Sequence, residues 1–157
     1  MDSKSTVYPK SLDEPLYAIG FRLDELSPQK VTGHLRVTEI NCQPFKVLHG
    51  GVSALIAEAL SSLGAVMASG FKRVAGLQVS VNHIKSVNLG DLVFSEAVPV
   101  QVGRTVQVWE VKMWKIDPLN SETRSLVSSS RVTLLSGLPI PNDAVKAVQN
   151  LKKYAKL

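Results

Sequence analysis

The stretch from Gly50 to Phe71, GGVSALIAEALSSLGAVMASGF, decides the fold of this chain. It is rich in alanine and leucine and contains no proline, so it is predicted to form one long helix. Glu58 is the only charged residue in it. A helix that is apolar on nearly every side is buried in a core or spans a membrane. The serines, the glycines and the central acid, which costs about 2.5–3.5 kcal/mol on insertion scales, favour a buried core helix.

Strand patterns surround this helix. Val31 to Val37 alternates between apolar and polar residues, which is typical of a half-buried strand. Residues 41–48 are predicted to be a loop because Pro44 interrupts them, and Asn142 is predicted to cap a last short helix. An antiparallel sheet wrapped around one central helix satisfies this order, so an α+β fold is predicted. The predicted strands cover residues 17–23, 31–37, 77–84, 92–102, 106–116 and 125–135.

Length and composition limit the class of protein. The chain has 157 residues, of which 45% are hydrophobic and 20% charged, which suits one domain with a sizeable core and argues against disorder. Residues 1–14 are predicted to be a flexible segment and residues 15–157 a single domain. The net charge of +5 favours anionic partners, but the basic residues are scattered and carry no nucleic-acid-binding signature, so nucleic acid is not expected as a partner. A membrane is not expected either.

The single cysteine and the three histidines point away from two kinds of site. Cys42 could act as a nucleophile with His49 as its base, but no third orienting group is apparent, so a packing role is favoured. The histidines are too widely spaced for a metal motif. We therefore expect neither a metal nor a cofactor.

Glu58 has neighbours that suggest chemistry. Ser62 follows it by four residues and shares its helical face. His49-Gly50-Gly51 lies at the helix entrance, where backbone N–H groups lack intrahelical partners and favour a developing oxyanion. A buried acid, a nearby hydroxyl and an anion site together indicate a hydrolytic site. The alternative is a helix face that meets a polar patch at a subunit boundary.

These residues also carry a resemblance to a known family. Gln43, Leu48-His49-Gly50-Gly51, Ala57-Glu58-Ala59 with Ser62, and Asn82-His83 resemble the hotdog-fold acyl-CoA thioesterases, and among them the 4-hydroxybenzoyl-CoA type. The similarity extends over nearly the whole chain after Pro15. It implies a hotdog fold, an acyl-CoA substrate with an aromatic acyl group, and an active site formed between subunits of a homodimer or homotetramer.

The resemblance also implies roles for individual residues. Glu58 is the nucleophile or the general base, and the Gly50 N–H and the Gln43 side chain polarise the thioester carbonyl. His49 positions the thiol or carbonyl end, and Ser62 orients water or the carboxylate. The implied substrate-binding residues are Gly51, His83, Ser129, Ser130 and Arg131. The phosphates of CoA call for basic residues at the site mouth. Arg104 is a second candidate, although a solvated surface charge is favoured for it, and Lys72, Arg73 and Lys85 are further options that nothing in the sequence distinguishes.

Three alternatives remain at this stage: a fatty acyl-CoA thioesterase, a hotdog dehydratase or hydratase, and a non-catalytic acyl-CoA sensor. The apolar pattern does not distinguish an aromatic from a fatty acyl group. The last residues, Ala155-Lys156-Leu157, are similar to the SKL-type peroxisomal signal, with alanine in place of serine. A peroxisomal location, and a peroxisomal import receptor as a partner of this tripeptide, are therefore expected.

Overall fold

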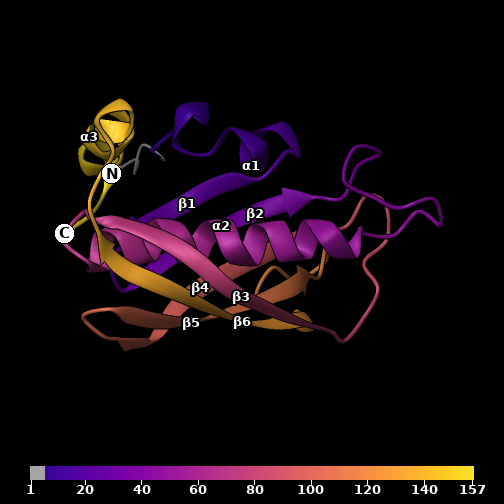
Figure 1. The fold of residues 1–157 in the computed structure, drawn as a ribbon. Helices are drawn as coiled ribbons and strands as arrows, with labels where there is room; N and C mark the ends of the chain where they lie inside the picture. Colours follow the sequence, from indigo (N-terminus) through magenta and orange to yellow (C-terminus); the bar gives the residue numbers. More distant parts are fainter. Residues whose placement is uncertain (1–5) are drawn as a thin grey trace.

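The computed structural model describes residues 6–157, in which one long helix, α2 (Gly50–Ala68), lies along a six-stranded antiparallel sheet (Figure 1). This is the hotdog arrangement, so the predicted α+β class is confirmed. The strands run in the order β1-β2-β4-β5-β6-β3, which leaves β3 at one edge of the sheet. Their bounds are β1 (Arg22–Ser27), β2 (Lys30–Arg36), β3 (Arg73–His83), β4 (Leu92–Val102), β5 (Val106–Ile116) and β6 (Arg124–Leu138).

The second half of α2 packs directly on β5. A Cβ atom added at Gly64 would lie 2.4 Å from the Trp109 ring, so only glycine lets the helix approach the indole this closely. The Trp109 Nε1–H donates to Gln107 Oε1 at 2.8 Å, and Gln107 Nε2 donates to the Ala65 carbonyl at 3.0 Å. Both side chains are fully buried. These bonds satisfy the buried polar groups and fix α2 against the sheet.

The beginning of the domain differs from the prediction. A strand is predicted over residues 17–23, but the structure forms a short helix, α1 (Glu14–Ala18), and β1 starts only at Arg22. The Asp13 side chain accepts a hydrogen bond from the Leu16 N–H at 3.0 Å, and Pro15 occupies the first turn. A cap and a proline at these positions favour a helix start over an extended chain.

The predicted cap of the last helix is also wrong. Asn142 lies inside a 3₁₀ turn, η2 (Asn142–Ala144), and makes no capping hydrogen bond. The turn closes through the Ala144 N–H and the Pro141 carbonyl at 3.0 Å. The helix α3 (Val145–Tyr154) therefore starts three residues after Asn142, too far for its side chain to act as the cap.

The segment predicted to be flexible, residues 1–14, is in part packed on the domain. Residues 1–5 lie outside the described part of the chain. The Tyr8 side chain is buried, with its ring 6.0 Å from that of Tyr154, and a 3₁₀ turn, η1 (Lys10–Leu12), follows it. Asn150 Nδ2 donates to Ser11 Oγ at 2.8 Å. This segment and α3 lie side by side at one end of the molecule (Figure 1).

One chain does not cover α2 completely. The helix is long and apolar enough to cross a membrane, but it lies on the sheet, and only about half of it is buried. Leu77 on the edge strand β3 is 59% exposed. The exposed side of α2 and the unpaired edge of β3 therefore form an open flank on the single chain.

Candidate active site

The entrance of α2 offers one free backbone amide. His49 is the N-cap, and its Nδ1 accepts a hydrogen bond from the Gly51 N–H at 2.9 Å. The Val52 N–H donates to the His49 carbonyl at 2.9 Å. Within residues 6–157, the Gly50 N–H donates to no acceptor. It is thus an unpaired donor at the positive end of the helix dipole, where negative charge is stabilised.

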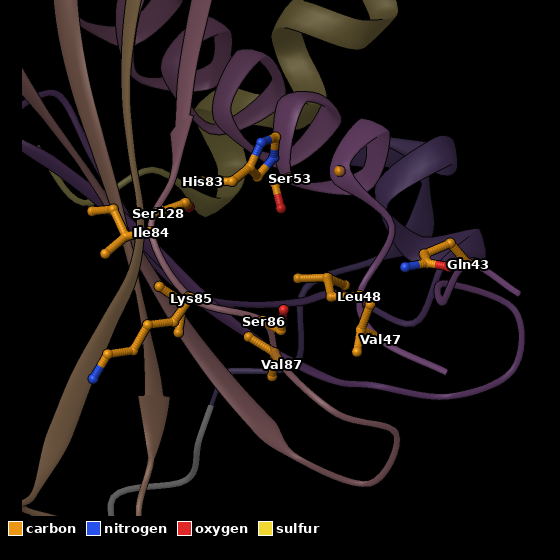
Figure 2. A pocket seen from close by; sticks show the side chains of 12 residues that line it. Gln43, Val47, Leu48, Ser53, His83, Ile84, Lys85, Ser86, Val87 and Ser128 are labelled. Carbon is orange, nitrogen blue, oxygen red and sulfur yellow. The ribbon is translucent and has the colours of Figure 1, made fainter. Parts of the chain in front are cut away.

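Gln43 lies in the loop before the helix with its side chain oriented by the main chain. The Gln43 Oε1 accepts a hydrogen bond from the Phe45 N–H at 2.7 Å, and the main-chain N–H of Gln43 donates to the Val47 carbonyl at 2.8 Å. Because the oxygen is held by Phe45, the Nε2 group is the end that remains available as a donor. Figure 2 shows Gln43 at the rim of the cavity that α2 opens on.

The cavity at this end of α2 has a volume of about 260 Å³. Gln43, Gly50 and His83 all line it, and a Cβ added at Gly50 would lie only 3.2 Å from His83 Cε1. The structure therefore brings these three predicted site residues together. His49 and Gly51, also predicted, are not among the lining residues; His49 uses Nδ1 as the helix cap. Ser53 and Ser128 also line the cavity, and neither was predicted as a site residue from the sequence.

Glu58 and Ser62 lie in a different hollow. This hollow, of about 410 Å³, is bounded by α2 and by residues 11–15. Glu58 is eight residues from Gly50, or about 12 Å along the helix at 1.5 Å per residue. Its carboxylate lies against β3, since a Cβ added at Gly76 would be 2.6 Å from Oε1. Within one chain the acid and the free amide are therefore not in the same site.

The expectation that Glu58 is buried is wrong for the single chain, in which this residue is exposed. The sequence indicates a helix that is apolar on nearly every side. In the structure Glu58 projects toward the open flank, against the edge strand β3, and not into the core between α2 and the sheet.

The predicted run Ser129-Ser130-Arg131 is divided between the two faces of β6. Ser130 is buried on the face toward α2, and its hydroxyl has no partner within the described residues. Arg131 points to the other face, where its Nη2 lies 3.2 Å from Glu110 Oε2. Alternation along a strand requires this division. The same alternation places Ser128 with Ser130 on the inner face, which is the signal that could have identified Ser128.

Cys42 lies close to this cavity without lining it. Cys42 is partly buried, packs against the core and forms an isolated β-bridge with Leu48, which lines the cavity. Within residues 6–157, no three His, Cys, Asp or Glu side chains are placed to hold a metal ion.

Comparison with known proteins gives the class. Residues 45–121 match the Thioesterase superfamily. The 1,4-dihydroxy-2-naphthoyl-CoA thioesterase 2 of Arabidopsis thaliana is 55% identical over 154 residues, covering 98% of this chain and 97% of that protein. The 1,4-dihydroxy-2-naphthoyl-CoA hydrolase of Listeria monocytogenes is 37% identical, over 74% of this chain and 89% of that protein. A solved thioesterase from Haemophilus influenzae has a TM-score of 0.69 and 29% identity, covering 82% of this chain and 85% of its own.

The chain belongs to the thioesterase superfamily. It is a thioester hydrolase with the hotdog fold, so both the enzyme class and the fold implied by the sequence resemblance are confirmed.

Proposed function

We propose that this protein hydrolyses 1,4-dihydroxy-2-naphthoyl-CoA to 1,4-dihydroxy-2-naphthoate and CoA, a step of phylloquinone biosynthesis. Relatives from a plant and from a bacterium that carry this substrate in their names support the proposal, the first over nearly the full length of the chain. The structural observation that carries it is that the Gly50 N–H, which has no acceptor within residues 6–157, lines the same cavity as the oriented Gln43 amide.

These two donors suit the first step of thioester hydrolysis. As the carbonyl carbon is attacked, negative charge develops on its oxygen, and one well-placed donor there contributes about 2.7–4 kcal/mol. The C–S bond then breaks. If Glu58 is the base, it takes a proton from the attacking water and passes it to the CoA thiolate; if Glu58 is the nucleophile, it forms an anhydride that water hydrolyses, and the proton of that water balances the thiolate. Glu58 serves as the nucleophile or as the base that activates water, Ser62 orients that water or the carboxylate, and His49 and His83 position the substrate.

The active site is completed by a second copy of the chain. In one chain Glu58 lies about two helical turns from Gly50 and in a separate hollow. The exposed side of α2 and the open edge of β3 are the surfaces on which a second copy would dock. A homodimer, or a homotetramer built from two dimers, would bring Glu58 of one subunit to the helix entrance of the other.

Mixing two inactive variants tests the shared site. Gly50→Pro removes the amide donor, and Glu58→Gln removes the acid. In a mixed heterodimer, one site combines the Gly50 N–H of the Glu58→Gln chain with the Glu58 carboxylate of the Gly50→Pro chain. Because this site is intact, the mixture is expected to regain activity. No recovery after mixing and subunit exchange would contradict a site shared between subunits.

A substrate panel tests the reaction. Release of CoA thiol is measured with 1,4-dihydroxy-2-naphthoyl-CoA, 4-hydroxybenzoyl-CoA and palmitoyl-CoA. We expect the highest kcat/KM for the naphthoyl substrate. Faster hydrolysis of palmitoyl-CoA would indicate a fatty acyl-CoA thioesterase, binding without release would indicate a sensor, and hydration of an enoyl-CoA would indicate a hydratase. A single turnover in ¹⁸O-labelled water distinguishes the two roles of Glu58, because label in its carboxylate requires a covalent anhydride.

We also propose a peroxisomal location, with Ala155-Lys156-Leu157 read by the import receptor. Leu157 is 85% exposed, but the Lys156 N–H donates to the Leu26 carbonyl at 2.8 Å and Ala155 packs on the core. Receptor binding therefore requires release of this bond. A fluorescent protein fused ahead of residue 6 should enter peroxisomes and lose this location when Leu157 is deleted; an unchanged location would contradict the proposal.

A further inference from the structure

We propose that Ser128 binds a hydroxyl group on the aromatic ring of the acyl group and makes the site selective for hydroxylated aryl thioesters. This inference rests on the proposed function, since it concerns the acyl side of the same cavity. It assigns a specificity role to a residue outside the predicted oxyanion and acid groups.

The sheet register places Ser128 beside the reactive end of the cavity. Ser128 on β6 is directly opposite His83 on β3. Residues that are directly opposite in an antiparallel pair point to the same face, with Cβ atoms about 4.5–5.5 Å apart. His83 in turn lies against Gly50. An acyl group whose carbonyl oxygen is held by the Gly50 N–H therefore extends over His83 toward Ser128.

The Ser128 hydroxyl is buried and unsatisfied. The residue is 1% exposed, it lines the cavity, and within the described residues its Oγ has no hydrogen-bond partner. A buried hydroxyl without a partner destabilises the structure that contains it. Figure 2 shows Ser128 beside His83, with Ser53 on the helix side of the same space. Ser53 is 3% exposed and also lines the cavity.

Whether the Ser128 hydroxyl gains a hydrogen-bond partner depends on the substrate. A plain aryl or alkyl group that fills the cavity leaves Ser128 Oγ unpaired, whereas a ring hydroxyl can donate to it or accept from it. A site that hydrogen-bonds a substrate hydroxyl rejects the analogue without it much more strongly than an apolar pocket rejects one extra methylene. The cavity therefore favours an acyl group of the dihydroxynaphthoyl kind.

The chain offers a matched control in Ser95. Ser95 on β4 and Ser128 on β6 both pair with Met113 on the strand between them, so they lie in one row across the sheet. Ser95 is fully buried and its hydroxyl also lacks a partner within residues 6–157, but it does not line the cavity. Ser95→Ala thus removes the same group from an equivalent environment without touching the proposed ligand.

The test compares Ser128→Ala and Ser95→Ala on 1,4-dihydroxy-2-naphthoyl-CoA and on unsubstituted 2-naphthoyl-CoA. In the wild type kcat/KM should be higher for the dihydroxy substrate. Ser128→Ala should lower kcat/KM about tenfold or more for the dihydroxy substrate and change kcat/KM less than about twofold for 2-naphthoyl-CoA. Ser95→Ala should leave the ratio of kcat/KM between the two substrates unchanged. Ser128→Cys, which keeps the shape but donates weakly, should also lower the ratio and serves if Ser128→Ala does not fold.

Two failures of this test have different meanings. A wild-type protein that does not hydrolyse 1,4-dihydroxy-2-naphthoyl-CoA overturns the proposed function. If the wild type does hydrolyse it, the two Ser128 variants decide the assignment. Ser128→Ala and Ser128→Cys variants that lose the same activity on both substrates, or that lose none on either, overturn only the assignment of Ser128.

Discussion

The Glu58 carboxylate of α2 lies against the main chain of Gly76 on the edge strand β3. A Cβ added at Gly76 would be 2.6 Å from Glu58 Oε1, and its three nearest atoms all belong to Glu58. The register of β3 against β6 shifts between Gly76 and Gln78. Such irregularities are common beside active sites, where they redirect a chain or a side chain. Because Gly76 has no side chain, there is room at this position for the carboxylate of the proposed catalytic acid.

Replacing Gly76 by alanine should move this acid. Gly76 does not need a left-handed conformation, so the main chain accepts alanine and the new methyl group displaces the carboxylate. Since small misplacements of reacting groups are costly, we expect kcat to fall about 10- to 100-fold with a nearly unchanged melting temperature. Ser80→Ala, on the exposed part of the same strand, is the control. Full activity of Gly76→Ala would show that the position of Glu58 is not critical.

Glu58→Gln should abolish most turnover without unfolding the protein. General acid–base catalysis contributes about 10²–10⁴-fold, so kcat should fall by that order. Because Glu58 is exposed in the chain, the free energy of unfolding should change by less than about 0.5 kcal/mol. Thiol release and urea unfolding are measured on the variant and on Glu122→Gln, which lies in an exposed turn. Undiminished thiol release would remove Glu58 from the mechanism.

Gly64 and Trp109 should be energetically coupled. Gly64→Ala introduces a methyl group 2.4 Å from the Trp109 ring, and overpacking of this kind costs about 1–3 kcal/mol. Trp109→Phe removes the outer ring atoms involved, so the alanine should cost less in that background. A double-mutant cycle on the free energy of unfolding measures the difference. If the two changes in the free energy of unfolding add strictly, then α2 shifts away from Trp109 to make room for the methyl group.

Asp13 should make stability depend on pH. Burial raises the pKa of its carboxyl above the ordinary value of 3.8, and the hydrogen bond from the Leu16 N–H offsets part of this. The folded protein therefore holds this proton more tightly than the unfolded chain does. The contribution of Asp13 to stability thus falls as the pH rises from near 3.8 through the folded pKa, and stays lower above it.

Asp13→Asn tests this pH dependence. Asparagine keeps the capping acceptor but does not titrate. The variant should be at least as stable as the wild type at neutral pH, and its stability should lack this decline in mildly acidic solution. Thermal unfolding across the pH range measures both, with the exposed Asp143→Asn as the control. A variant that is less stable than the wild type at neutral pH would contradict the expected sign.

The sequence by itself determined the elements whose patterns are long and regular. The apolar run from Gly50 and the alternating valine-rich strands β4 and β5 predicted a central helix on a sheet, and the structure has β4 and β5 at the predicted bounds. Periodicity fixes these elements because each one depends on burying its own apolar face. The family motif likewise indicated a thioesterase.

Tertiary structure alone decided which of these residues meet. The pairing of His83 with Ser128, and the contact of His83 with Gly50, join segments distant along the chain through strand register and helix packing. The position of Glu58 on the open flank likewise depends on which side of α2 the sheet covers. Local patterns show that a side chain lies on a face, but the packing of distant segments decides what that face touches.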